Sequence, residues 1–182
     1  LSAGIASAAY VAAPALFPLV AIEQAKLSFR HGVTASSAFA MSVLGILFAS
    51  PVGDLDAAFA CATTAEQILD RVGPASIEGR ARYVATVYLR IWKKPVNEIW
   101  SLCPAIERRC LETGDLEFAA WAAMMRVKHA LFSGHSLLEA EPEARRSIDN
   151  IAHLKQGTAL NYTRMTVQAM RNLAGRSRET HE

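Results

Sequence analysis

The sequence lacks the short motifs that mark common catalytic sites. It has no phosphate-binding glycine loop, no Gly-x-Ser-x-Gly turn, no His-Glu-x-x-His pair and no kinase or ATPase signature. No run of alternating Val, Ile or Thr suggests a strand. The formal net charge is only +2, and no lysine-rich stripe with interleaved aromatic residues is present. We therefore predict a segment that is not an enzyme, has no cofactor or metal site and does not bind nucleic acid.

Cysteine is also scarce, since the chain has only Cys61, Cys103 and Cys110. Cys103 and Cys110 share a helical face by their spacing, but neither has a His or Cys partner at metal-binding distance. We interpret all three as small buried apolar groups in a reducing compartment, and so predict a cytoplasmic location.

Charge is absent from residues 1–22 and 33–53, and either stretch is long enough to cross a bilayer of about 30 Å. The first stretch contains Pro14 and Pro18 and lacks a basic leader. The second is rich in Ala and Ser and has no flanking aromatic belt. We predict no membrane span, with a membrane-spanning second stretch as the lesser alternative.

What the sequence does contain is a repeat. Four glycines, Gly32, Gly73, Gly114 and Gly157, are 41, 41 and 43 residues apart, and each opens a long helix-forming stretch. A fixed period between about 20 and 50 residues is typical of stacked supersecondary units. Interaction is therefore a better first hypothesis than catalysis.

Each unit has the same internal plan. A first helix of about 18 to 20 residues ends at Gly53, Pro95, Gly134 or Gly175, and a second stretch returns to the next opening glycine. The second stretches are Asp54 to Val72, Val96 to Thr113, and His135 to Gln156. We expect αα-hairpins with a period of about 41 residues that stack as a tetratricopeptide-like solenoid, a right-handed superhelix.

The helix prediction rests on periodicity and composition. Between Ala75 and Trp92, apolar residues keep to steps of three and four, and Ala, the best helix former, dominates throughout. Pro104 and Pro142 fall inside second helices, and we expect each to kink the helix or to open a restarted one. The prediction is an all-α chain in which residues 1–176 form one domain and residues 177–182 a polar tail.

Partner binding is the leading function for such a solenoid, whose first helices line the concave side. The polar and aromatic candidates on first helices are Arg80, Tyr83, Arg126, His129, Arg164 and Gln168. Each could instead form hydrogen bonds between repeats.

A small-molecule receptor is the alternative, with aromatic and Met side chains around an apolar pocket inside the superhelix. The residues proposed for this pocket are Phe39, Tyr83, Tyr88, Trp92, Trp121, Met124 and Met125. They could equally be core between repeats. An enzyme that uses His129 or His135 ranks last, and Glu139, Glu141 and Glu143 are interpreted as acidic groups that offset a helix dipole.

Short matches along most of the chain carry a family resemblance. They are Pro14-x-x-Phe17, Leu27-Ser28-x-x-His31-Gly32, Ser37-x-Phe39-Ala40, Gly53-Asp54, Trp92-Lys93, Thr113-Gly114-Asp115-Leu116-Glu117, Phe132-Ser133-Gly134, Leu154-Lys155-Gln156, Thr158-Ala159-Leu160-Asn161-Tyr162 and Asn172-Leu173. The chain resembles the helical-repeat middle of large bacterial multidomain signalling proteins. In that family a Ser/Thr-kinase-like domain and a predicted AAA-type signal-transduction ATPase precede the repeats, and GAF and histidine kinase domains commonly follow.

The resemblance implies a scaffold or sensor arm that contacts another protein or neighbouring domains of a parent ATPase or protein kinase. It supplies no catalytic residue within this segment. We also expect the segment to be truncated at both ends, because solenoids usually carry polar capping repeats and this chain opens on an uncharged stretch. Bare apolar faces would then make the isolated segment self-associate.

Overall fold

The computed structural model describes residues 2–73 and 75–176, and over these residues the chain is helical with no strand. The all-α prediction is therefore confirmed for the described part of the chain. The chain divides into two compact units between Lys94 and Pro95. The prediction of one continuous domain stays a prediction. The expected polar tail, residues 177–182, lies outside the described residues.

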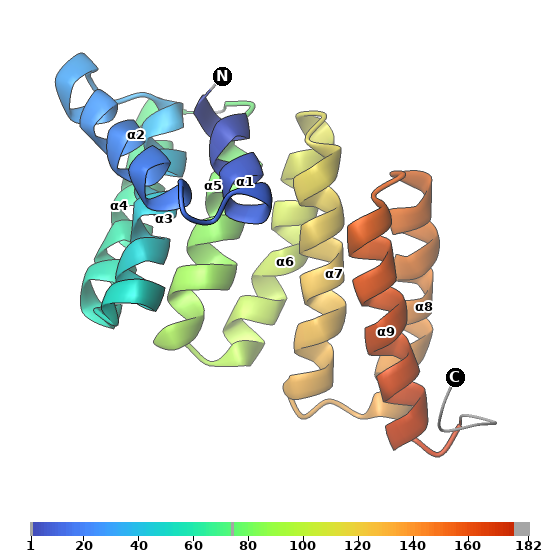
Figure 1. Cartoon of the computed structure of the whole chain (residues 1–182). Helices are drawn as coiled ribbons and strands as arrows, with labels where there is room; N and C mark the ends of the chain where they lie inside the picture. The colour runs from blue at the N-terminus through green and yellow to red at the C-terminus, as the bar shows by residue number, and fades with distance from the viewer. Residues whose placement is uncertain (1, 74, 177–182) are drawn as a thin grey trace. The chain divides into compact units, whose positions relative to one another are not determined.

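Unit 1 contains five α-helices among its described residues, two of which are extended by tighter or wider turns (Figure 1). The helices are α1 (Ser2–Ala12), α2 (Phe17–His31), α3 (Ala35–Leu47), α4 (Leu55–Val72) and α5 (Glu78–Val84). A π-helical turn, η1 (Phe48–Val52), prolongs α3. A second π-helical turn, η2 (Ala85–Leu89), and a 3₁₀ turn, η3 (Arg90–Trp92), prolong α5. The helix expected from Ala75 thus starts later, at Glu78, and changes pitch after Val84.

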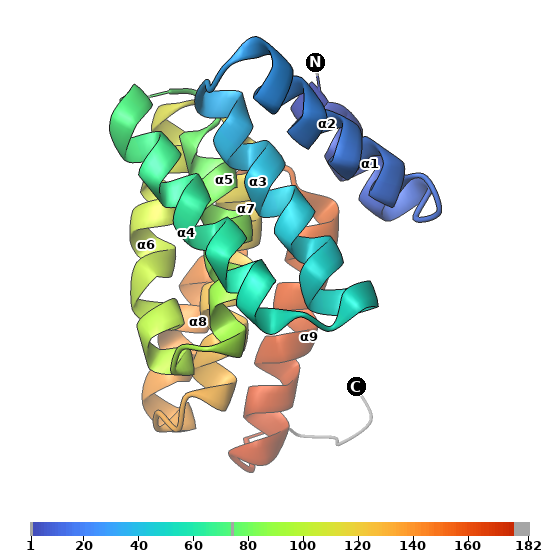
Figure 2. The same cartoon turned by 90° about the vertical axis from the view of Figure 1, so that its left-hand side faces the viewer.

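Helix α3 is the centre of unit 1, because it packs against α2, α4, α5 and η2. Figure 2 shows α3 beside α4, with the α1–α2 hairpin along one edge. The buried cluster between α4 and η2 is made of small side chains and one large one, namely Ala58, Cys61, Ala62, Ala85 and Leu89. The helices one predicted repeat apart, α3 and α5, are therefore direct neighbours.

Unit 2 contains four helices of equal length among its described residues. They are α6 (Val96–Glu112), α7 (Leu116–Phe132), α8 (Leu137–His153) and α9 (Gly157–Leu173). Helix α7 contacts α6, α8 and α9, and α8 contacts α9. Two buried clusters join α7, α8 and α9, one around Met124 and Ile151 and the other around Val127 and Met170. Helices α7 and α9, again one predicted repeat apart, lie side by side (Figure 1).

Glycine and aspartate form two of the hairpin turns at the positions that the sequence predicts. Gly53 and Gly114 adopt positive φ angles of 77° and 74°, which glycine tolerates and other residues rarely do. The next residue caps the following helix: Asp54 accepts a hydrogen bond from the N–H of Ala57 at 2.9 Å, and Asp115 accepts one from Phe118 at 3.4 Å. A Gly-Asp pair therefore ends one helix and starts the next.

The prolines in the second helices do not restart those helices. Pro104 lies in the middle of α6 and Pro142 in the first half of α8, and both helices are continuous across them. Because proline has no backbone N–H, the carbonyls of Trp100 and Leu138, four residues earlier, lose their usual intrahelical donor. Tertiary packing of α6 and α8 outweighs that local cost.

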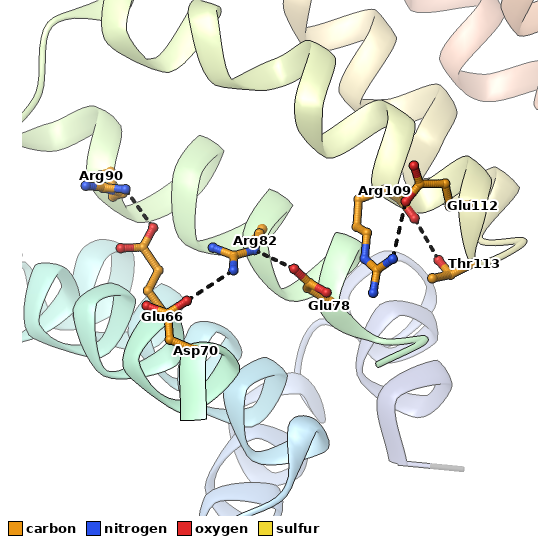
Figure 3. Close-up of polar contacts among 8 residues, drawn as sticks. All are labelled: Glu66, Asp70, Glu78, Arg82, Arg90, Arg109, Glu112 and Thr113. Carbon is orange, nitrogen blue, oxygen red and sulfur yellow. Dashed lines mark hydrogen bonds and ion pairs between the residues drawn. The ribbon is translucent and has the colours of Figure 1, made fainter. Parts of the chain in front are cut away.

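Ion pairs order the antiparallel contact between α4 and the α5–η3 segment (Figure 3). Arg90 pairs with Glu66 at 2.6 Å, and Arg82 bridges Glu78 at 3.0 Å and Asp70 at 3.4 Å. Lys93 pairs with Asp56 of α4. The Arg90–Glu66 pair is partly buried, whereas Asp70 and Asp56 are exposed. Exposed pairs each contribute about 0–1 kcal/mol, so these fix register more than they stabilise. In unit 2, Figure 3 also shows the pair Arg109–Glu112 within α6.

Large apolar side chains are exposed along the first two helices. They are Ile5, Tyr10, Val11, Leu19, Ile22, Leu27 and Phe29. This surface fits the expected self-association, which stays a prediction.

By length and composition Ala35–Val52 could also cross a membrane, and a buried core helix passes the same test. Its Ser42 hydroxyl donates to the carbonyl of Ala81 at 3.2 Å, a contact within unit 1.

A single methyl group tests how closely the helices of unit 1 pack. A Cβ on Gly45 would lie 2.5 Å from Leu89 Cδ1 and 3.0 Å from Cys61 Cβ, and Leu89 is fully buried. We expect Gly45→Ala to lower the free energy of unfolding by about 1 kcal/mol, because overpacking exceeds the gain in helix preference. Urea unfolding followed by circular dichroism measures this. Gly4→Ala, which meets open space in α1, should not destabilise, and equal stability of both variants would contradict the packing.

Candidate functional site

A groove in unit 2 is one of the hollows that the described residues form. It has a volume of about 170 Å³ and is walled by side chains of α6, α7 and α8, with His135 contributed by the turn before α8. Its floor is apolar and made of small residues, Val127, Ala130, Ala140 and Ala144. Its polar rim consists of Trp100, Arg126, His135, Glu139, Glu143 and Ser147. We call this the α6–α8 groove.

Arg126 ties the three helices of the groove together. From α7, its Nη1 lies 2.6 Å from Glu143 Oε1 on α8, and its Nη2 donates to Ser147 Oγ at 3.3 Å. Nη2 also lies 4.0 Å from Glu107 Oε2 on α6. The Arg126 side chain is only 20% exposed, so these interactions are screened less than surface pairs. The guanidinium is therefore already neutralised by two carboxylates.

Burial acts on the groups beside Arg126. Desolvation raises the pKa of Glu107, although Arg126 opposes that change. Desolvation also raises the pKa of the Cys103 thiol on α6 to about 12. Cys103 is therefore an unreactive thiol at neutral pH, because the thiolate is the reactive form.

Trp100 and His135 form an aromatic wall at one end of the groove. Their ring centroids are 4.7 Å apart, with planes tilted by 46°. The positive φ of Gly134, 78°, turns the chain so that His135 precedes the first residues of α8. The indole Nε1 of Trp100 is buried and has no hydrogen-bond partner among the described residues. A buried donor without a partner carries a desolvation cost, and because protein atoms cover this nitrogen, no ligand in the groove reaches it.

A second charged cluster surrounds Glu141 on α8. This carboxylate is 6% exposed, and Arg145, Arg171 and Arg176 lie 3.1, 3.7 and 3.0 Å from it. The hydrogen bond from Arg176 is the largest cause that lowers the pKa of Glu141, and Arg145 and Arg171 add to it. Since Glu141 lies off the groove, its role is to hold α8 against α9 and the residues after α9.

The predicted partner-binding residues fall into different environments. Arg126 lines the α6–α8 groove, and Arg164 is exposed on α9. Gln168 donates to Asn172 within α9 at 3.0 Å. Tyr83 and His129 are buried, 3% and 4% exposed, and Arg80 lies over the ring of Phe39 at 5.9 Å. Buried Tyr83 and His129 occupy the core in this structure, where no partner reaches them.

The residues predicted for an apolar pocket do not line the groove. In unit 1, Phe39 is buried, Tyr88 stacks edge-on against Tyr83, and the indole of Trp92 is 57% exposed and donates to the Tyr88 carbonyl. In unit 2, Met124 is buried in the core cluster against which Trp121 and Met125 pack. Phe39, Tyr88 and Met124 therefore lie in or against the core of their own units, whereas Trp92 lies on the surface.

Sequence reasoning missed Trp100, interpreted Glu139 and Glu143 only as groups that offset a helix dipole, and named His135 only for an enzyme. One signal was available, because Glu139 and Glu143 are four residues apart and so share a helix face that Glu141 does not. Among the described residues, no group of three or more His, Cys, Asp or Glu side chains is placed to hold a metal ion.

Comparison with known proteins adds no relative. No protein-family model matches the chain, and neither a curated protein nor a solved structure is significantly similar to it.

Arg126 gives the first test of this site. We expect Arg126→Met to lower the free energy of unfolding by about 2 kcal/mol, because it leaves Glu107, 15% exposed, without its opposite charge. Arg126→Met combined with Glu107→Leu should recover most of that loss, since the one carboxylate that remains, Glu143, is 44% exposed and keeps its contact with water. Urea unfolding of the three proteins measures the difference. A double variant no more stable than Arg126→Met would show that the charge pairing is not what matters.

His129 gives a test based on pH. Burial, with a smaller contribution from Lys128, lowers its pKa below 6.5 in the folded chain. The folded state then binds fewer protons than the unfolded state, so stability is full above pH 6.5 and falls as the pH drops toward the lower folded pKa. His129→Leu should remove this part of the pH dependence. Urea unfolding at about pH 7 and about pH 5.5 measures the free energy of unfolding of both proteins. An equal change in this free energy between the two pH values in both proteins would refute the role of His129.

Proposed function

We propose that this chain is a non-catalytic helical-repeat segment that works by contact with a protein segment or a neighbouring domain. In the proposal, its hairpins stack as a tetratricopeptide-like solenoid within a bacterial signal-transduction kinase or ATPase, in the cytoplasm. The parent context rests on the family resemblance of the sequence. The three free, buried cysteines, Cys61, Cys103 and Cys110, fit a reducing compartment.

The observation that carries the proposal is the packing of helices one period apart. Within unit 1, α3 contacts α5, and within unit 2, α7 contacts α9. In a helical-repeat protein each unit buries its apolar face against the next, so first helices of successive units are neighbours. These two contacts are the ones that stacked hairpins require.

The dimensions of the α6–α8 groove favour a side chain over a whole metabolite. Pockets that enclose small molecules usually measure about 300–1,000 Å³. The groove measures about 170 Å³ and is open at its exposed rim, where Glu139 and His135 lie. This supports a polypeptide partner that lies along the helices and inserts one residue. The small-molecule receptor remains the alternative that the experiment below distinguishes.

A peptide-display selection against the full 182-residue chain tests the proposal. Selected peptides are resynthesised and their binding is measured by fluorescence anisotropy. We expect dissociation constants on the order of 10 µM, and we expect Arg164→Ala on first helix α9 to weaken binding about fivefold, or about 1 kcal/mol. Arg108→Ala is the matched control, because Arg108 is a 75% exposed cation on second helix α6.

Two outcomes would overturn the proposal. One is a failure to select any peptide that binds the folded chain. The other is stabilisation of the chain by a metabolite, growing with concentration in a thermal-shift panel, with no peptide binding, since ligand binding to the folded state adds stability by mass action. The second outcome would support the receptor alternative.

A further inference from the structure

From the α6–α8 groove we propose a specific ligand chemistry: the groove binds a lysine or arginine side chain of a partner segment, with the aliphatic stem on the alanine floor and the cation between Trp100 and Glu139. This inference rests on the proposed function, because it names what that contact recognises. It concerns one site on unit 2 and does not depend on how the two units are arranged.

Charge in the groove favours a cation. Its rim holds one cation, Arg126, and two carboxylates, Glu139 and Glu143. Glu143 is already paired with Arg126 at 2.6 Å, and Glu107 lies 4.0 Å from the same guanidinium. Glu139 is exposed and is the rim carboxylate for which the structure records no ion pair. An anionic ligand would meet this carboxylate and a guanidinium that two carboxylates already neutralise.

The aromatic wall favours a cation as well. An ammonium or guanidinium group placed over an aromatic ring is attracted by the negative face of the ring, and Trp provides the strongest such site. Trp100 is supported from one side by the core cluster that contains Val127 and Ala130, and His135 lies 4.7 Å away as the second aromatic ring. The indole ring is therefore held in place before any ligand arrives.

The floor completes the match to a residue within a polypeptide. Ala130, Ala140 and Ala144 leave room for a methylene chain, and long cationic side chains bury such stems along apolar surfaces. A free inorganic cation has no such stem.

The test uses the isotopically labelled full chain and a defined probe, N-acetyl-lysine methylamide. The indole N–H signals of Trp92, Trp100 and Trp121 are assigned with Trp→Phe variants and followed by NMR during titration. We expect the Trp100 signal to shift and saturate with a dissociation constant on the order of 1 mM, while the other two indole signals stay in place. The norleucine analogue, which has the stem without the charge, should bind at least about tenfold more weakly.

Matched variants locate the carboxylate. Glu139→Gln should weaken lysine binding about threefold, as expected for loss of one exposed ion pair. Glu117→Gln is the control, because Glu117 is an exposed carboxylate in the first turn of α7 and does not line the groove. Equal lysine affinity in the two variants would overturn the proposed role of Glu139.

The remaining outcomes separate this inference from the proposed function. Norleucine binding as strong as lysine binding, stronger binding of the corresponding glutamate probe, or a Trp100 signal unmoved by lysine would each refute the cation site. If selected peptides still bind the chain in those cases, the proposed function stands and another surface carries it. If lysine shifts Trp100 but no peptide can be selected, the site stands and the proposed function fails.

Discussion

Close approach of helices through small side chains is the constraint on which both units depend. Gly45 faces Leu89 and Cys61 at a distance that leaves no room for a methyl group. Alanine occupies other buried positions on the helices, as at Ala81 in unit 1 and Ala120 in unit 2, both fully buried. Helices packed this closely make many contacts with few large residues, which explains how a chain with 8% aromatic residues forms a core. Large apolar side chains also lie on the surface of α1 and α2.

The fold could be predicted where local chemistry decides it. The pairs Gly53-Asp54 and Gly114-Asp115 end one helix and cap the next wherever they occur, so the hairpin boundaries followed from the sequence. The π-helical turn at Ala85–Leu89 could not be foreseen, because it goes with burial of Leu89 against Gly45 of another helix. The continuous helices across Pro104 and Pro142 could not be foreseen for the same reason. The local cost of each proline is visible in the sequence, while the packing that outweighs it is not.

The candidate site was predictable only in part. Arg126 could be singled out as a cation on a largely apolar helix, but its partners Glu107 and Glu143 come from two other helices. Trp100 and His135 are 35 positions apart, and only the fold brings their rings together. Most aromatic residues chosen for a pocket pack in or against a core, because large apolar side chains at helical spacing are usually buried between helices, while Trp92 lies on the surface. What distinguishes Trp100 from them is its place beside an open groove, which only coordinates reveal.

A crystal structure of the chain with a bound partner peptide tests the account most directly, since the claim is that a helical-repeat surface recognises a polypeptide through the α6–α8 groove. The account predicts a lysine or arginine side chain of the peptide on the face of Trp100, with its charged end at Glu139. A peptide seated on another face of unit 2 or on unit 1, with the groove empty, would contradict it.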